Sequence, residues 1–274
     1  MNILIISNVD NDEILEDVFI ARAFQNDGHK VLLTSIDYDE RLDNIVDIVI
    51  RRNSWISNSK HLENYYGVVK EVKARIINKN LPRINFDGKF DGGNKSYLVK
   101  LFKDGYPVIP SIDSIKDLCL LPSSDYYLLK PKESHDGIGI KKVNKDNLKD
   151  EFNDNYIIQP VIKFKSEVQF YFIKDEFQYA LEFFPSKVPI YPEAIKYQYS
   201  DKELEIAKIF ASLNNNYYGV QRIDFLKREN NELLLTEIED IAPYLDLDRL
   251  EKQDRDRFIN NYKKMVYEYL KKRK

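Results

Sequence analysis

The chain has 274 residues, of which 43% are hydrophobic, 13% aromatic and 32% charged. It is too apolar for an intrinsically disordered chain and long enough to bury a sizeable core, in one large domain or in two or three smaller ones. The 42 Lys and Arg residues nearly balance the 45 Asp and Glu residues, giving a net charge of −3. Without an excess of positive charge, nucleic acid is not expected as a partner.

A single cysteine, Cys119, and three widely spaced histidines exclude an intramolecular disulfide and a cysteine-rich zinc module. The first residues, MNILIISNVDND, lack the basic leader of a signal peptide. No apolar run approaches the roughly 20 residues that a membrane helix needs. We therefore expect a soluble, cytoplasmic protein without a membrane partner.

Residues 1–85 predict an α/β domain built on a parallel sheet, of Rossmann-like type. An apolar run at residues 3–7 predicts a buried strand, and apolar residues then recur at helical spacing until Gly28. Two further apolar runs start at Val31 and Ile45. The turn after the first strand has no glycines, which disfavours NAD binding of the usual kind.

Residues 86–274 are expected to form a second domain, with lobes at about 94–160 and 161–274. The segment RINFDGKFDGG, residues 83–93, has no helical period and predicts a linker or mobile loop. Predicted elements then follow in this order: a helix from Asn94 to Gly105, β-rich sequence over 126–184, a helix opened by a Ser200–Glu203 capping box, two strands over 217–240 and a final amphipathic helix.

Two glycines, Gly137 and Gly139, follow Lys130 in the segment KPKESHDGIGI between two predicted strands. Glycines let backbone N–H groups approach a phosphate closely, and a lysine at the preceding strand end can neutralise its charge. A glycine-containing hairpin with solvated lysines explains this segment equally well.

Four charged residues on the last two predicted strands form the most informative pattern. Arg222 and Asp224 share one face of the first strand, and Glu237 and Glu239 share one face of the second. If these faces coincide, three carboxylates and a guanidinium converge in otherwise apolar surroundings, which favours a compensating cation. Oxygen-only ligands select Mg²⁺ or Mn²⁺ over zinc. The alternative is a solvated strand face with paired charges.

The strand end IIQPVI offers a third pattern. A chain that leaves a sheet in extended conformation has free backbone N–H and C=O groups for a planar base, although Pro160 contributes only its carbonyl. Glu167 follows nearby and could accept hydrogen bonds from ribose hydroxyls. Taken alone, this is also the sequence of an ordinary strand end.

Together and in this order, the segments from about Asn94 to Asp246 resemble the ATP-grasp superfamily, in the branch of bacterial glutathione synthetase, D-alanine:D-alanine ligase and the RimK-type glutamate ligases. The resemblance implies an α/β fold in which a two-lobed ATP-grasp domain follows the N-terminal domain. It also implies ATP and Mg²⁺, or Mn²⁺, as cofactors.

The resemblance assigns nucleotide-binding roles to three segments. NKSYLVKLFKDGYPVIPS supplies Lys95 as the first nucleotide-contacting lysine, and YLLKPKESHDGIGI supplies the second lysine and the loop that closes over the phosphates. IIQPVI is similar to the hinge along the adenine, with an acid for the ribose beyond it. The implied ATP-binding residues are Lys95, Lys130, Ser134, Gly137, Gly139, Gln159, Pro160, Val161, Ile162 and Glu167.

GVQRIDF and LLLTEIED are similar to the family's metal-binding strands. This likeness implies Asp224 and Glu237 as magnesium ligands and Arg222 as the arginine that steadies the transferring phosphoryl group. The family usually has Glu-x-Asn where this chain has Glu237-Ile238-Glu239, which leaves the third ligand open. Glu239 can supply an oxygen, and Asp240 could do so only if a bulge shifts the register.

The activity implied is an ATP-dependent carboxylate–amine ligase that forms an amide or peptide bond through an acylphosphate. Its substrates would be a small carboxylate and an amine, such as amino acids or peptides. Arg51 and Arg52 end the third predicted strand, where such a sheet presents substrate-binding groups, although surface arginines capping a strand explain them equally. A small-molecule kinase and a non-catalytic ATP-binding regulatory protein are the alternatives, and the resemblance is compatible with a homodimer.

Overall fold

The N-terminal part of the chain forms a four-stranded parallel sheet. The structure is a computed structural model that describes residues 1–8, 15–54, 62–90, 94–134, 137–185, 194–214 and 218–273. For residues 62–66 it describes only the backbone. The strand order is β2-β1-β3-β4. The strands are β1 (Asn2–Ile6), β2 (Lys30–Thr34), β3 (Ile48–Arg51) and β4 (Arg83–Ile84). The expected parallel sheet is therefore confirmed.

Helices cover both faces of this sheet, which explains why its central strands are almost wholly apolar. One face packs against α1 (Leu15–Asn26) and the C-terminal helix α6 (Lys252–Lys272), and the other packs against α2 (Leu62–Asn78). A short 3-10 helix, Glu40–Asn44, precedes β3. No described helix is both long and apolar enough to span a membrane.

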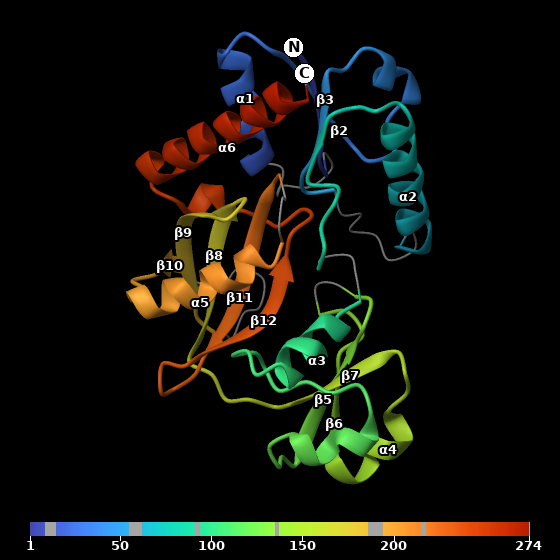
Figure 1. Ribbon diagram of the computed structural model, residues 1–274, viewed down its shortest axis with the longest axis vertical. Helices are drawn as coiled ribbons and strands as arrows, with labels where there is room; N and C mark the ends of the chain where they lie inside the picture. Colours follow the sequence, from blue (N-terminus) through green and yellow to red (C-terminus); the bar gives the residue numbers. More distant parts are fainter. Residues whose placement is uncertain are drawn as a thin grey trace.

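A five-stranded antiparallel sheet lies next to the parallel sheet, in the order β10-β9-β8-β11-β12 (Figure 1). One face packs against α5 (Asp201–Ser212), which begins at the Ser200–Glu203 capping box expected from the sequence. The strands are β8 (Ser166–Ile173), β9 (Glu176–Phe183), β10 (Ala194–Lys196), β11 (Val220–Lys227) and β12 (Leu233–Glu239).

A smaller three-stranded antiparallel sheet, in the order β6-β5-β7, lies at the far end of the molecule (Figure 1). Its strands are β5 (Tyr126–Pro131), β6 (Lys141–Asn144) and β7 (Tyr156–Pro160). Beside it lie α3 (Ser96–Lys103), α4 (Leu148–Glu151) and the 3-10 helices Ile115–Leu120 and Lys145–Asn147. Residues 161–165 connect β7 of this sheet to β8 of the large sheet.

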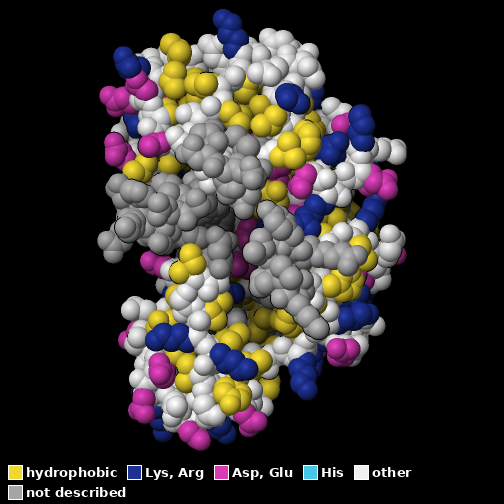
Figure 2. All heavy atoms as spheres, turned by 180° about the vertical axis from the view of Figure 1, so that it is seen from behind, with side chains coloured by type: hydrophobic (Ala, Val, Ile, Leu, Met, Phe, Trp, Pro, Cys, Tyr) yellow, Lys and Arg dark blue, Asp and Glu magenta, His cyan; other side chains and the backbone are white. Residues whose placement is uncertain are grey.

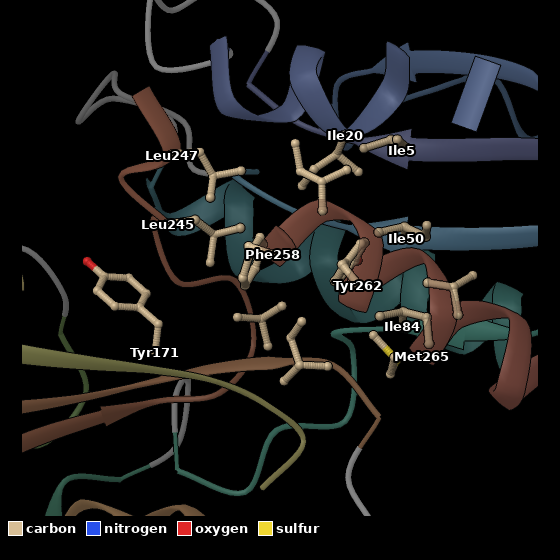
Figure 3. Close-up of a cluster of buried hydrophobic side chains, with 14 of the residues drawn as sticks. Ile5, Ile20, Ile50, Ile84, Tyr171, Leu245, Leu247, Phe258, Tyr262 and Met265 are labelled. Atoms are coloured by element: carbon tan, nitrogen blue, oxygen red, sulfur yellow. The ribbon is translucent and has the colours of Figure 1, made fainter. Parts of the chain in front are cut away.

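The parallel sheet and the large antiparallel sheet share one apolar core. Figure 3 shows Ile50 and Ile84 of the parallel sheet near Tyr262 and Met265 of α6, with Tyr171 of the large sheet on the opposite side of the cluster. Helix α6 thus joins the two sheets, and its buried side chains match the amphipathic pattern predicted for the last helix. Burial of these apolar side chains stabilises the packing of the parallel sheet against the large antiparallel sheet.

The expected linker over residues 83–93 is held more firmly than its glycines suggested. Its first two residues form β4, and the Asn85 side chain donates a hydrogen bond to the Val220 carbonyl. A Cβ atom on Gly88 would clash with Cγ1 of Ile241, so the chain passes this point closely enough to require glycine. Residues 91–93 lie outside the described part of the chain.

Candidate active site

The charged residues of β11 and β12 lie on one face of the large sheet. In the antiparallel register, Arg222 is opposite Glu239 and Asp224 is opposite Glu237. The intervening Ile223 and Ile238 are fully buried in the core beneath α5, so the charged side chains project from the other face. The two faces postulated from the sequence therefore coincide.

Arg222 is at the centre of this face. Its Nε lies 2.9 Å from Oδ1 of Asp224, and its Nη2 lies 2.9 Å from Oδ2 of the same carboxylate. Nη2 is also 2.6 Å from Oε1 of Glu239, and Nη1 donates to the Tyr244 carbonyl at 3.2 Å. One guanidinium thus joins the two strands and fixes both carboxylates in a partly buried setting.

Two lysines approach the same face from the part of the chain that carries the small sheet. Lys95, at the start of α3, places Nζ 2.7 Å from Oε1 of Glu237 and also donates to the Ser134 carbonyl. Lys130, near the end of β5, is partly buried, and this burial lowers its pKa although the charge of Glu237 opposes the shift. Two lysines from the part of the chain that carries the small sheet therefore meet the carboxylates of the large sheet.

The pKa values of two acids on this face are shifted in opposite directions. Burial alone would raise the pKa of Glu237, but the charges of Lys130 and Lys95 outweigh burial and lower it. Glu167 lies at the exposed rim on β8, where desolvation by its neighbours and the charge of Asp224 raise its pKa. Glu237 is thus held as a carboxylate by two lysines.

The glycine-rich segment forms an exposed turn after β5. Gly137 and Gly139 have φ values of +69° and +78°, and the Ile140 N–H donates to the Gly137 carbonyl at 3.2 Å. Positive φ is unfavourable for other residues, so glycine is required by this backbone. His135 and Asp136 lie outside the described part of the chain.

The expected adenine segment follows β7. The Gln159 side chain is buried, and its amide nitrogen donates a hydrogen bond to Oγ of Ser111 at 2.9 Å. The amide nitrogen therefore already has a partner within the protein. Pro160 is buried, Ile162 is half-buried and Val161 is 39% exposed. A base at this segment would therefore meet the backbone and the apolar side chains, and not the Gln159 amide.

The donor chemistry of the large-sheet face fits a hard divalent ion. Asp224, Glu237 and Glu239 offer oxygen atoms only, which Mg²⁺ prefers. Within the described residues, no three acidic, His or Cys side chains are already arranged as a metal centre, because each of these carboxylates is turned towards Arg222 or Lys95. The ion would thus take over carboxylate contacts that protein cations now make.

Asp240 is bound elsewhere and does not join this face. Its Oδ2 accepts hydrogen bonds from the Phe90 N–H at 3.0 Å and from Nδ2 of Asn214 at 2.9 Å. The bulge in this strand pair lies between Asp224 and Phe225 and leaves Glu237 and Glu239 in register with β11. The register shift that would bring Asp240 onto this face is therefore not seen in this strand pair, and the identity of the third ligand stays a prediction.

Arg51, the last residue of β3, and Arg52, which follows it, are both buried. Nε of Arg51 donates to Oγ of Ser54 at 3.0 Å. Arg52 is fully buried, with Nη2 2.6 Å from Oε1 of Glu16 and Nε 3.0 Å from Oδ1 of Asp17. Sequence reasoning missed these acidic partners, although they open the helix after β1 and the ends of neighbouring parallel strands lie at one edge of a sheet.

Viewed from behind, the molecule has a depression near its middle, and acidic side chains are visible at the bottom of it (Figure 2).

No family model and no curated protein matches the sequence. Solved structures match almost the whole chain. D-cycloserine synthetase DcsG is 14% identical over 96% of this chain and 100% of its own, with a TM-score of 0.69. D-alanine–D-alanine ligase from Bacillus anthracis, complexed with ATP, is 13% identical over 99% of this chain and 98% of its own, with a TM-score of 0.65. ATP-grasp ligase PsnB, complexed with a minimal precursor, Mg and ADP, is 12% identical over 96% and 97%, with a TM-score of 0.64.

Proposed function

Because the chain has the ATP-grasp fold, we propose that it is an ATP-dependent carboxylate–amine ligase. The observation that carries this proposal is the single face on which Arg222, Asp224, Glu237 and Glu239 meet Lys95 and Lys130. Cations that suit phosphate and carboxylates that suit a divalent ion lie together there. The similar structures support the proposal, since they include a ligase complexed with ATP and another complexed with Mg and ADP.

In the proposed complex, Lys95 and Lys130 neutralise the ATP phosphates, and the turn containing Gly137 and Gly139 covers them together with Ser134. Residues 159–162 lie along the adenine, and Glu167 accepts from the ribose. Lys130 suits this role because burial lowers its pKa, so an approaching polyphosphate stabilises its protonated form.

Asp224, Glu237 and Glu239 are the proposed ligands of Mg²⁺, and Mn²⁺ has the same ligand preference. When bound, the ion would neutralise charge on the phosphates during transfer. Arg222 lies between two of these carboxylates, where its guanidinium can stabilise the charge that develops on the transferring phosphoryl group.

The chemistry of amide formation explains why such a site needs ATP. An amine does not displace oxide from a carboxylate near neutral pH. In the proposed reaction, a carboxylate oxygen of the substrate attacks the γ-phosphorus, the bond to the β–γ bridging oxygen breaks, and ADP leaves. The amine then attacks the acylphosphate carbon, and inorganic phosphate leaves with the C–O bond electrons as the amine loses a proton. Positioning and charge neutralisation are sufficient for both steps.

The substrates are proposed to be an amino acid or peptide and an amine, with Arg51 near the substrate. Arg52 is less suited to a substrate carboxylate, since Glu16 and Asp17 already neutralise it. This also weakens the kinase alternative, because a phosphorylated or polyanionic substrate would need more positive charge than Arg51 and Arg52 supply in the described part of this sheet end.

A paired screen of amino acids and dipeptides tests the proposal. Each pair is incubated with ATP and Mg²⁺, ADP and free phosphate are measured, and the condensed product is sought by mass spectrometry. We expect equal amounts of ADP, phosphate and product from the wild type, and amounts lower by about 100-fold or more from Asp224→Asn. ADP with the phosphate retained on the product would indicate a kinase, and nucleotide binding without turnover by any pair would indicate a regulatory protein. Either result would overturn the ligase proposal.

A further inference from the structure

A bound divalent ion would compete for some of the hydrogen-bond partners of Arg222 and leave others in place. Among the described residues, its side chain contacts Asp224, Glu239 and the carbonyl of Tyr244. Both carboxylates are proposed metal ligands, so a bound ion would compete with the guanidinium for them. The Tyr244 carbonyl, 3.2 Å from Nη1, is the described contact that an ion on the carboxylates would leave in place.

Tyr244 belongs to a mostly buried irregular segment, residues 243–246, which we call the bridging segment. Irregular backbone in a protein interior needs partners for its polar groups. Two of these partners come from the N-terminal part of the chain: the Pro243 carbonyl accepts from Nη2 of Arg52 at 3.0 Å, and the Leu245 N–H donates to Oε2 of Glu16 at 2.8 Å. The Leu245 carbonyl accepts from the Tyr179 hydroxyl of β9. The bridging segment therefore lies between the N-terminal ion pair and the proposed active site.

The end of the bridging segment is fixed by Asp246. Its Oδ2 accepts from the Tyr171 hydroxyl at 2.7 Å, and its Oδ1 lies 2.9 Å from Nε of Arg249. Asp246 has a φ of +50°, which is unfavourable for a residue with a side chain and persists only where its surroundings hold it. Tyr171 is fully buried on β8 and supplies part of this restraint.

We propose that Tyr171 and Asp246 are positioning residues for Arg222. They hold the bridging segment so that the Tyr244 carbonyl aims the guanidinium at the transferring phosphoryl group when a divalent ion occupies the carboxylates. This inference rests on the function proposed above for Arg222. It also gives the N-terminal sheet a route to the reaction, through Arg52 and Glu16, without contact to the nucleotide.

Two conservative variants and one matched control test the proposal. Tyr171→Phe removes the hydroxyl that binds Asp246, and Asp246→Asn removes the charge at the other end of that hydrogen bond. Tyr262→Phe is the control, because Tyr262 is fully buried in the same apolar core and its hydroxyl has no hydrogen-bond partner among the described residues. Thermal unfolding identifies any variant that is not folded, and Tyr171→Phe decides the matter if Asp246→Asn fails to fold.

The first readout is the guanidinium NMR signal of Arg222, assigned by its loss in Arg222→Lys and recorded with saturating Mg²⁺. We expect slow rotation about the Nε–Cζ bond in the wild type and in Tyr262→Phe, and rotation at least about tenfold faster in Tyr171→Phe and Asp246→Asn. Unchanged rotation in both folded variants would overturn the proposal. This readout needs Mg²⁺ at the carboxylates but no substrate pair, so it does not depend on finding the substrates of the ligase.

The second readout uses any substrate pair that the wild type turns over. Misplacing a catalytic group by about 1 Å can cost roughly 100-fold in rate, so we expect kcat to fall by roughly 10- to 100-fold in both variants. KM for ATP should stay within about twofold, because Lys95 and Lys130 are untouched. A kcat equal to that of Tyr262→Phe in both variants would contradict the positioning role.

Discussion

Two arginines in this protein each bind two carboxylates, yet their surroundings differ. The side chains of Arg52, Glu16 and Asp17 are all fully buried, whereas those of Arg222, Asp224 and Glu239 are 11%, 15% and 26% exposed. The first cluster lies between an N-terminal helix and the end of β3, and the second lies on an open sheet face beside two lysines.

The difference in exposure separates a structural role from a chemical one. A buried ion pair cannot exchange its partners, and removal of one charge leaves the others without compensation in a medium of low dielectric constant. In a partly exposed cluster, a carboxylate can exchange its arginine or lysine partner for a bound ion, because water and the incoming ion reduce the electrostatic cost of separating the pair. The Arg52 cluster should therefore govern stability, and the Arg222 cluster should govern activity.

The largest effect is expected when the fully buried cluster loses its cation. Arg52→Met leaves Glu16 and Asp17 buried without a counter-charge, and it should lower the free energy of unfolding by about 3–5 kcal/mol. Chemical denaturation measures this change. Arg41→Met is the control, since Arg41 pairs with Asp39 at the surface and the loss of that pair should change stability little.

A second variant tests the origin of this effect. Adding Glu16→Gln to Arg52→Met removes one of the two uncompensated charges and should recover part of the lost stability. Equal stability of Arg52→Met and the wild type would show that this buried cluster is not structural.

The next effect should appear in activity and not in stability. Asp224→Asn keeps the shape of the side chain and leaves Arg222 paired with Glu239, so the unfolding temperature should change little. The loss of one charged group at the phosphoryl-transfer site should reduce ADP formation by about 100-fold or more. Large destabilisation together with the activity loss would remove the contrast between the two clusters.

A smaller effect is expected from Glu239→Asn, which restores the residue usual at this position in the resembled family. Asn still offers an oxygen, and Arg222 keeps its bidentate contact with Asp224. We expect the maximal rate to stay within about tenfold of the wild type, with a higher Mg²⁺ concentration needed for half-maximal rate. An unchanged Mg²⁺ requirement would show that the charge of Glu239 does not strengthen metal binding.

The smallest effect concerns an ion pair between Lys196 of β10, which is exposed, and Asp254 of α6, which is mostly buried. Nζ of Lys196 and Oδ2 of Asp254 lie 2.6 Å apart. The hydrogen bond from Lys196 lowers the pKa of Asp254 below its ordinary value of 3.8. A lowered folded-state pKa stabilises the fold above that ordinary value, and the contribution disappears as the pH falls through the folded-state pKa.

Lys196→Met should therefore reduce the free energy of unfolding by less than about 1 kcal/mol at neutral pH, since Lys196 is largely exposed. The difference from the wild type should vanish in strong acid, as urea unfolding over a series of pH values can measure. A difference that grows towards low pH would contradict this assignment.

The fold was predictable from sequence where the pattern is local. Alternation along β11 and β12 places Arg222, Asp224, Glu237 and Glu239 on one face without any knowledge of tertiary contacts, and the Ser200–Glu203 capping box marks the start of α5. Periodicity of this kind depends only on backbone geometry, so it survives in the folded structure.

Contacts between distant segments could not be predicted in the same way. Nothing near Arg52 in the sequence indicates that Glu16 will neutralise it, and nothing near Arg222 indicates the Tyr244 carbonyl. The buried position of Asp240 likewise depends on the 83–90 segment passing beside it. These partners are set by how the sheets pack together, which the local pattern of polar and apolar residues does not encode.

The most direct test of the account is calorimetric binding of AMP-PNP with and without Mg²⁺, in the wild type and in Glu237→Gln. The account predicts that Mg²⁺ tightens binding to the wild type by about tenfold or more, equivalent to about 1.4 kcal/mol. In Glu237→Gln this tightening should be lost while Mg²⁺-free binding persists through Lys95 and Lys130. Equal dependence on Mg²⁺ in the two proteins would contradict the claim that these carboxylates hold an ion at the nucleotide phosphates.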